Sequence, residues 1–177
     1  MKNYHILADP HFNHIAMIDI CNRPENFQLR LQQSLSQIPN GDIFICLWDF
    51  CIWRDELMHQ YMLWALDCTK ILIRWNHDKK SDAWYLNHGW DLVLDEMKLD
   101  MYGFHILFTH APVIFDHYFF DEHPYSVNIH WHLHRWEHRT TTEDSGYQHY
   151  LVSCELQWYQ TQTLQSIIRK HKHRCQW

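Results

Sequence analysis

The chain has 177 residues, of which 46% are hydrophobic and 20% are charged, a composition typical of one globular domain with a substantial core. Its formal net charge of −6 disfavours a protein that coats nucleic acid, because phosphate binding requires a basic surface. There is no long apolar run, and the first residues lead into a predicted strand without a secretory segment, so we expect a cytoplasmic protein without a membrane span.

Strands and helices are predicted to alternate in the first half of the chain. Short apolar runs predict strands at residues 4–8, 43–48 and 71–74. Helices are expected at residues 14–21, 26–38, 55–66 and 81–87, the second and third of them from apolar residues spaced by three or four. In the third of these helices, the spacing places on the buried side Leu57, Tyr61, Trp64 and Ala65.

Consecutive strands replace this alternation in the second half of the chain. They are expected at residues 92–94, 97–101, 104–108, 127–129 and 147–156, followed by a closing helix at 163–171. Tyr102 and Gly103 are expected to form a tight hairpin turn, and residues 115–124 an aromatic, acidic loop over the site. This organisation predicts one α/β domain across residues 1–177, with two packed, mainly mixed β-sheets flanked by helices.

The six cysteines are expected to be reduced and buried. No two of them form a C-x-x-C pair, and no secretory segment precedes the first strand. We therefore interpret them as small apolar core residues rather than as disulfides or zinc ligands.

Residues of metal-binding type follow five of the predicted strands. They are Asp9-Pro10-His11, Asp49, Asn76-His77-Asp78, His110 and His130-Trp131-His132-Leu133-His134. Loops at the carboxyl ends of strands can converge on one point in an α/β fold, and carboxylate, imidazole and amide ligands suit a divalent metal. The pattern indicates a two-metal hydrolase, in which His130 is expected to pack or to support a ligand.

The order D-x-H, D, N-H-D, H and H-x-H resembles the motifs of the calcineurin-like metallophosphoesterases. The details are similar to their small bacterial and phage members in the stretches Asp9-Pro10-His11-Phe12-Asn13-His14, Cys21-Asn22-Arg23-Pro24 and Asn128-Ile129-His130. The resemblance covers residues 3–160. It implies a four-layer α-β-β-α sandwich and a hydrolase with a dinuclear metal site.

The same resemblance implies how two divalent ions are held. The expected ligands are Asp9, His11 and His134 for one ion, and Asn76, His110 and His132 for the other. Asp49 is expected to bridge them, since a carboxylate has two oxygens. Manganese is the expected metal, with iron, zinc and nickel as open alternatives.

The resemblance also implies the chemistry. A metal-bridging hydroxide is expected to attack the phosphorus, while His77 protonates the leaving alkoxide and Asp78 orients the His77 imidazole. The expected substrate is a small phosphorylated molecule, a phosphodiester; nucleic acid is less favoured because the chain is acidic. Asn13, His14 and Arg23 are candidates to contact the substrate phosphate, with solvated loop positions as the open alternative.

Three tryptophans depart from the family pattern. Trp48, Trp75 and Trp131 stand where the motifs of the family have glycine, before the bridging aspartate, before N-H-D and before H-x-H. Glycine permits positive φ and a close approach of backbone to metal, whereas tryptophan disfavours both. Two interpretations follow: an active phosphodiesterase, or a catalytically impaired metal-binding relative that binds a phosphate ligand or a partner.

Overall fold

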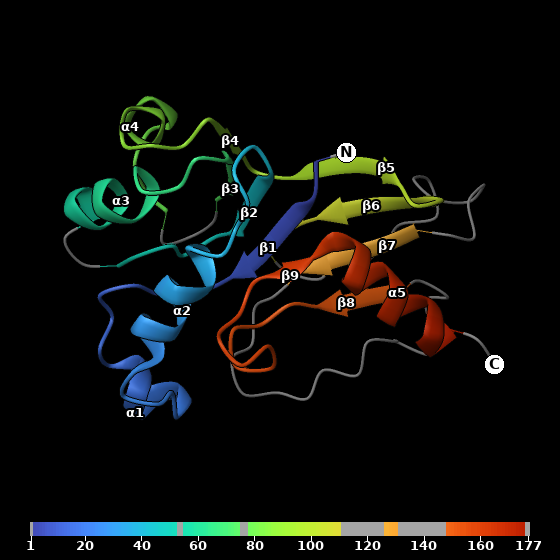
Figure 1. The fold of residues 1–177 in the computed structure, drawn as a ribbon, viewed down its shortest axis with the longest axis horizontal. Coiled ribbons are helices and arrows are strands. Elements are labelled where there is room, and N and C mark those ends of the chain that lie inside the picture. Colours follow the sequence, from blue (N-terminus) through green and yellow to red (C-terminus); the bar gives the residue numbers. More distant parts are fainter. Residues whose placement is uncertain (1, 53–54, 75–77, 111–125, 131–147, 176–177) are drawn as a thin grey trace.

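The fold is taken from a computed structural model that describes residues 2–52, 55–74, 78–110, 126–130 and 148–175 (Figure 1). Its helices and strands, in chain order, are β1 (Tyr4–Ala8), α1 (Met17–Cys21), α2 (Phe27–Leu35), β2 (Ile43–Leu47), α3 (Asp55–Leu63), β3 (Thr69–Ile73), α4 (Asp82–Asn87), β4 (Leu92–Leu94), β5 (Met97–Met101), β6 (Phe104–Phe108), β7 (Ser126–His130), β8 (Gln148–Leu151), β9 (Gln162–Thr163) and α5 (Leu164–Cys175).

The strands form two mixed sheets. The larger sheet has the order β4-β3-β2-β1-β9, in which β1 to β4 are parallel and β9 runs antiparallel to β1. The smaller sheet has the order β5-β6-β7-β8, in which β5 is antiparallel to β6 and the other pairs are parallel. This confirms the predicted α/β class with two mixed sheets flanked by helices.

Alternate residues of the larger sheet enter two different hydrophobic cores. On β2, Phe44 and Cys46 face a core shared with helices, while Ile45 and Leu47 face a core shared with the smaller sheet. All four side chains are fully buried, since successive residues of a strand point to opposite faces. Burial on both faces explains why these strands read as continuous apolar runs rather than as an alternating pattern.

The helices are divided between the two cores. Side chains of α1 to α4 pack on one face of the larger sheet, as Phe27, Leu31 and Leu35 of α2 illustrate. Helix α5, which lies apart from α1 to α4 in Figure 1, contributes Leu164 and Ile167 to the core shared by the two sheets. No helix among the described residues is long and apolar enough to cross a membrane.

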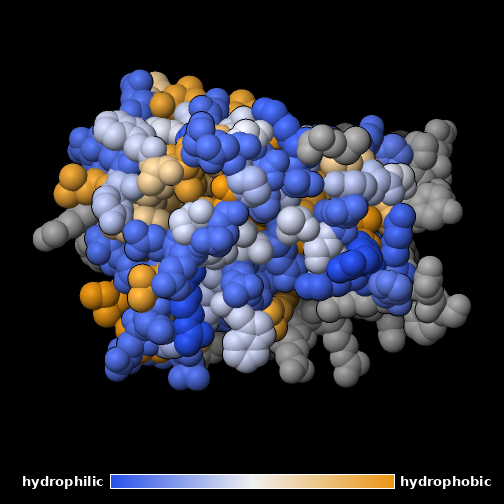
Figure 2. Space-filling model, viewed as in Figure 1, coloured by the Kyte–Doolittle hydropathy of each residue, from blue (hydrophilic) through white to orange (hydrophobic). Residues whose placement is uncertain are grey.

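The structure corrects the predicted face of α3. Leu57, Tyr61 and Trp64 were expected to be buried but are 64%, 67% and 68% exposed, and Ala65 is also exposed. The buried stripe contains Leu63, which is 0% exposed. Figure 2 shows hydrophobic side chains at the surface near α3, at the left of the view. The spacing of apolar residues is compatible with burial of the face that carries Leu57 or of the face that carries Leu63. Tertiary contacts made by the neighbouring buried residues select the face of Leu63.

One of those neighbours is a histidine. His59, also buried on α3, accepts a hydrogen bond of 2.8 Å at Nδ1 from the indole Nε1–H of Trp90. It also packs against the rings of Phe50 and Tyr85. His59 is therefore buried where the spacing of apolar residues predicted burial of Leu57 and Tyr61.

Several boundaries also differ from the prediction. Helix α1 begins at Met17 rather than at residue 14, and β8 ends at Leu151, after which residues 154–159 form turns. The short edge strand β9 was not predicted, because two residues leave no periodic signal. The hairpin turn is confirmed: Tyr102 and Gly103 both have positive φ, at 56° and 78°.

The cysteine prediction is confirmed for the described side chains. The thiols are buried and form no disulfide among the described residues at Cys21, Cys46, Cys51, Cys68 and Cys154. The predicted loop at 115–124 lies outside the described residues.

Candidate metal centre

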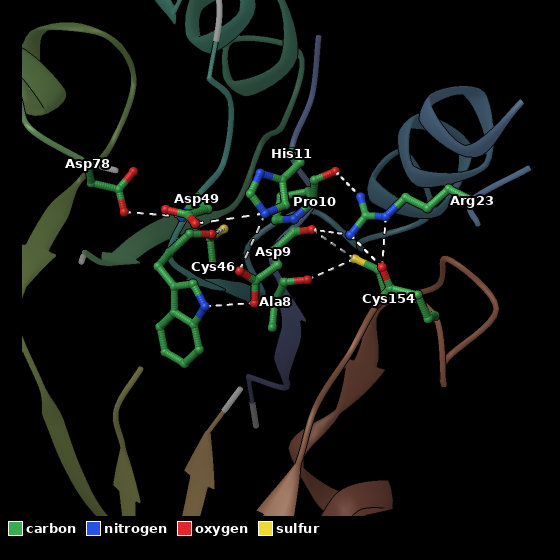
Figure 3. A network of polar contacts seen from close by, with 11 residues as sticks. Ala8, Asp9, Pro10, His11, Arg23, Cys46, Asp49, Asp78 and Cys154 are labelled. Atoms are coloured by element: carbon green, nitrogen blue, oxygen red, sulfur yellow. Dashed lines mark hydrogen bonds and ion pairs between the residues drawn. The ribbon is translucent and has the colours of Figure 1, made fainter. Parts of the chain in front are cut away.

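Asp9, His11 and Asp49 meet at the carboxyl ends of β1 and β2 (Figure 3). One ligand atom from each lies within 4.8 Å of the other two. His11 Nε2 is 3.6 Å from Asp9 Oδ1 and 3.8 Å from Asp49 Oδ2. All three residues are at most 3% exposed. The structure thus brings together two carboxylates and one imidazole that the sequence predicted as metal ligands.

Backbone pairing between two parallel strands explains this convergence. The β1–β2 pairing continues past the ends of both strands, because the N–H of Asp9 donates to the carbonyl of Leu47 and the N–H of His11 to that of Asp49. The two distances are 3.2 and 3.0 Å. The loop after β1 and the loop after β2 therefore leave the sheet side by side. This places Asp9 and His11 of the first loop beside Asp49 of the second.

The backbone of both loops is left-handed at several non-glycine residues. In the first loop, Asp9, His11 and Asn13 have φ of 48°, 50° and 65°. In the second, Trp48 and Asp49 have φ of 52° and 44°. Such conformations are costly for residues with a Cβ and persist where the surrounding structure holds them. Trp48 therefore adopts the conformation that makes glycine favourable at this position.

Arg23 holds the first loop from behind. Its Nη1 donates to the carbonyl of Pro10 at 2.8 Å and its Nη2 to that of Asp9 at 2.9 Å. Its Nε donates to Glu155 Oε1 at 2.8 Å, and the Arg23 side chain is 0% exposed. Cys154 adds a thiol hydrogen bond to the carbonyl of Ala8 (Figure 3). These contacts anchor the strained loop; contact of Arg23 with a substrate stays a prediction.

The electrostatics of the triad favour a bound cation. Burial raises the pKa of the Asp9 carboxyl well above its usual range, and the negative charge of Asp49 raises it further, while the hydrogen bond from Trp48 opposes the rise. A divalent ion between the two carboxylates would compensate both the burial and the repulsion. Two carboxylate oxygens and one imidazole nitrogen are also ligands that Mn²⁺, Fe²⁺ and Zn²⁺ accept. The residues present fit a divalent metal.

Asp78 and His110 lie beside the triad. Asp78 Oδ2 accepts a hydrogen bond from the backbone N–H of Asp49 at 3.1 Å, so the segment after β3 reaches the second loop. The His110 ring, after β6 of the other sheet, stands edge-on to the Trp48 ring with 4.5 Å between centroids. Both residues are buried, at 7% and 4% exposure. Residues from both sheets thus gather around the Asp9–Asp49 pair.

The other described candidates have different surroundings. The His14 ring lies 5.5 Å from the ring of His11, so it borders the triad. The backbone N–H of Asn13 donates to Gln28 Oε1 at 3.0 Å, which holds the end of the first loop. His130 is buried with its ring 5.1 Å from that of His149, in agreement with a packing role.

Some predicted site residues lie outside the described part of the chain. These are Trp75, Asn76, His77, Trp131, His132 and His134. Two contacts of the site were not predicted from the sequence, namely the hydrogen bond from Trp48 to Asp9 and the Arg23–Glu155 pair. The pair joins residues 132 positions apart, and no local spacing signals such a contact.

The fold and the site define a mixed α/β protein with a buried group of metal-ligand type. No known family description and no curated protein matches the chain. Among solved structures, it is similar to a protein of unknown function from Aquifex aeolicus, with a TM-score of 0.77 and 21% sequence identity. The match covers 96% of this chain and 99% of that one, and at this identity it concerns the fold alone.

Proposed function

We propose that the chain is a dinuclear metal-dependent phosphoesterase of the calcineurin-like type, acting on a phosphodiester. The observation that carries the proposal is the buried Asp9–His11–Asp49 group at the carboxyl ends of β1 and β2. On this proposal, the two sheets and the helices on the larger one belong to a four-layer α-β-β-α sandwich.

The resemblance to the family assigns the ligand roles, and the chemistry of the donors supports them. Asp9, His11 and Asp49 would supply three ligands of the first ion, with His134 as the fourth. Asp49 would also hold the second ion, together with the amide of Asn76 and the imidazoles of His110 and His132. Bound manganese ions would supply Lewis-acid stabilisation of the phosphoryl oxygens and an activated water.

The acidic triad itself explains why the site needs cations before it can accept phosphate. Asp9 and Asp49 are buried and negatively charged when ionised, so they repel an anionic ester. Their role is to hold positive charge where the negative charge of the transition state develops. His77 protonates the leaving alkoxide, and Asp78 links its segment to the backbone of Asp49.

Replacement of His77 tests this proposal. His77→Ala should retain Mn²⁺ binding and lose about 100-fold or more in the rate of phosphodiester hydrolysis, the usual contribution of general acid catalysis. Asn87→Ala, at an exposed position at the end of helix α4, is the control and should keep the full rate. An unchanged rate in His77→Ala would contradict the assigned role.

One observation favours a second candidate, a metal-binding relative with impaired catalysis. Trp48 is fully buried and adds an indole between Asp9 and His110, where the motif of the family has no side chain. The test is turnover in a variant with glycine in place of Trp48, Trp75 and Trp131. Turnover confined to that variant would favour the impaired relative, whereas equal turnover in the unaltered chain would exclude it.

A further inference from the structure

The indole of Trp48 contacts two residues of the candidate metal centre at once. Its Nε1–H donates to Asp9 Oδ2 at 2.7 Å, and its ring meets the edge of the His110 ring at 4.5 Å between centroids. Trp48 is 0% exposed and packs in the core between the sheets. A single side chain therefore joins a ligand of the larger sheet to a predicted ligand of the smaller one.

The hydrogen bond divides the two oxygens of Asp9. Oδ1 is the oxygen that lies 3.6 Å from His11 Nε2, on the side of the triad. Oδ2 accepts the indole N–H. The short hydrogen bond engages one lone pair of Oδ2 and orients the carboxylate plane, so Oδ1 is the oxygen directed to the His11 side of the triad. Without the donor, the carboxylate could rotate and present either oxygen, or both.

The backbone of Trp48 is held in place for this contact. Its N–H donates to the carbonyl of Ile73 at 2.8 Å, and its carbonyl accepts a hydrogen bond from the thiol of Cys46. These anchors hold the left-handed φ of 52°. The indole is thus directed at Asp9 by a backbone that is fixed on both sides.

We propose that Trp48 is a positioning residue that makes Asp9 a one-oxygen ligand of the metal. The inference rests on the proposed metal centre and adds a role for a residue that the family pattern does not contain. Hydrogen bonds to ligating groups from residues behind them orient the ligands, and their loss typically lowers metal affinity about 10- to 100-fold. If Trp48 only filled space, a replacement of similar volume would leave the metal affinity unchanged.

The experiment compares Mn²⁺ binding by the unaltered chain, Trp48→Phe and Trp90→Phe. Phenylalanine keeps an aromatic ring and removes the N–H donor. Trp90 is the matched control, because it is 2% exposed and its Nε1–H donates to His59, away from the triad. Titration calorimetry should show an affinity about 10- to 100-fold weaker in Trp48→Phe. Trp90→Phe should bind like the unaltered chain.

A spectroscopic signature separates positioning from packing. The electron paramagnetic resonance spectrum of bound Mn²⁺ should change in Trp48→Phe and stay unchanged in Trp90→Phe, because coordination by Asp9 changes in the first variant alone. If Trp48→Phe does not fold, benzothienylalanine in place of Trp48 keeps the shape of the indole and lacks the N–H. The same weakening and the same spectral change are expected of it.

The outcomes distinguish the inference from the metal centre on which it rests. Equal affinity and an unchanged spectrum in Trp48→Phe, or in the benzothienylalanine protein, would overturn the role of Trp48 while the metal centre stands. Equal weakening in Trp48→Phe and Trp90→Phe would also overturn it, since the effect would then come from any lost buried donor. Absence of Mn²⁺ binding by the unaltered chain would overturn both.

Discussion

Asp78 Oδ2 accepts a hydrogen bond of 3.1 Å from the backbone N–H of Asp49, and both residues are buried. This contact ties the segment after β3 to the loop that carries the candidate bridging carboxylate. A residue predicted to orient the general acid therefore also fixes the backbone of a predicted metal ligand.

Removing the acceptor from Asp78 should destabilise the protein. Asp78→Ala leaves the N–H of Asp49 buried without its acceptor, which costs about 1–3 kcal/mol of unfolding free energy. Asp78→Asn keeps an oxygen acceptor and should lose less. Urea unfolding of both variants and of the unaltered chain measures the difference. If Asp78→Ala were as stable as the unaltered chain, the contact would contribute little.

Replacement of Arg23 should destabilise the fold more than replacement of most other charged residues in the described part of the chain. Arg23→Met leaves Glu155 without its buried cation and two loop carbonyls without donors, so we expect a loss of about 3–5 kcal/mol of unfolding free energy. Arg74→Met is the control, because Arg74 pairs with Asp95 at the surface, where ion pairs contribute about 0–1 kcal/mol. Chemical denaturation that gave similar losses for the two variants would contradict the anchoring role.

His59 should make the fold sensitive to acid. Burial lowers the pKa of His59 from 6.5 to about 3, with a smaller contribution from His88. Its Nδ1 accepts the Trp90 N–H and must therefore stay unprotonated. Between these two pKa values the unfolded chain binds a proton that the folded chain does not, so stability falls as the pH drops below 6.5.

The expected slope is up to about 1.4 kcal/mol of unfolding free energy per pH unit. His59→Asn keeps an acceptor for Trp90 and removes the titration. Urea unfolding measured from pH 7 to about 4 should therefore show a shallower decline in this variant than in the unaltered chain. Parallel declines in the two proteins would argue that His59 is protonated in the folded state.

Two leucines of α3 test the corrected face of the helix. Leu63→Ala should cost about 2–5 kcal/mol of unfolding free energy, because Leu63 is 0% exposed. Leu57→Ala removes the same atoms from a position that is 64% exposed and should change stability by about 0.5 kcal/mol or less. Thermal and urea unfolding should rank the variants in this order; the reverse ranking would restore the face predicted from the sequence.

The strands, and the meeting of Asp9 and Asp49 at their ends, were predictable from short stretches of sequence. Burial on both faces makes β2 an unbroken apolar run, and a parallel pair of such strands brings Asp9 and Asp49 to one edge of the sheet. These features depend on residues close in sequence and on a general rule of α/β folds. No long-range contact had to be known.

The features that failed or were missed depend on tertiary contacts. The face of α3 is selected by the packing of His59 and its hydrogen bond with Trp90, which the apolar spacing does not encode. The anchoring of the first loop by Arg23 requires Glu155, which is remote in sequence. Trp48 was noted only as a tryptophan at a glycine position, and its hydrogen bond with Asp9 depends on the packed structure.

The proposed phosphodiesterase activity is tested most directly by the hydrolysis of bis(p-nitrophenyl) phosphate as Mn²⁺ is added, by the unaltered chain and by Asp49→Asn. Asp49 is the predicted bridging ligand, so its replacement should remove the Mn²⁺-dependent rate while the unaltered chain gains activity and saturates. A chain that binds Mn²⁺ but does not hydrolyse the diester, or an Asp49→Asn variant that keeps the full rate, would contradict a dinuclear phosphodiesterase centred on Asp49.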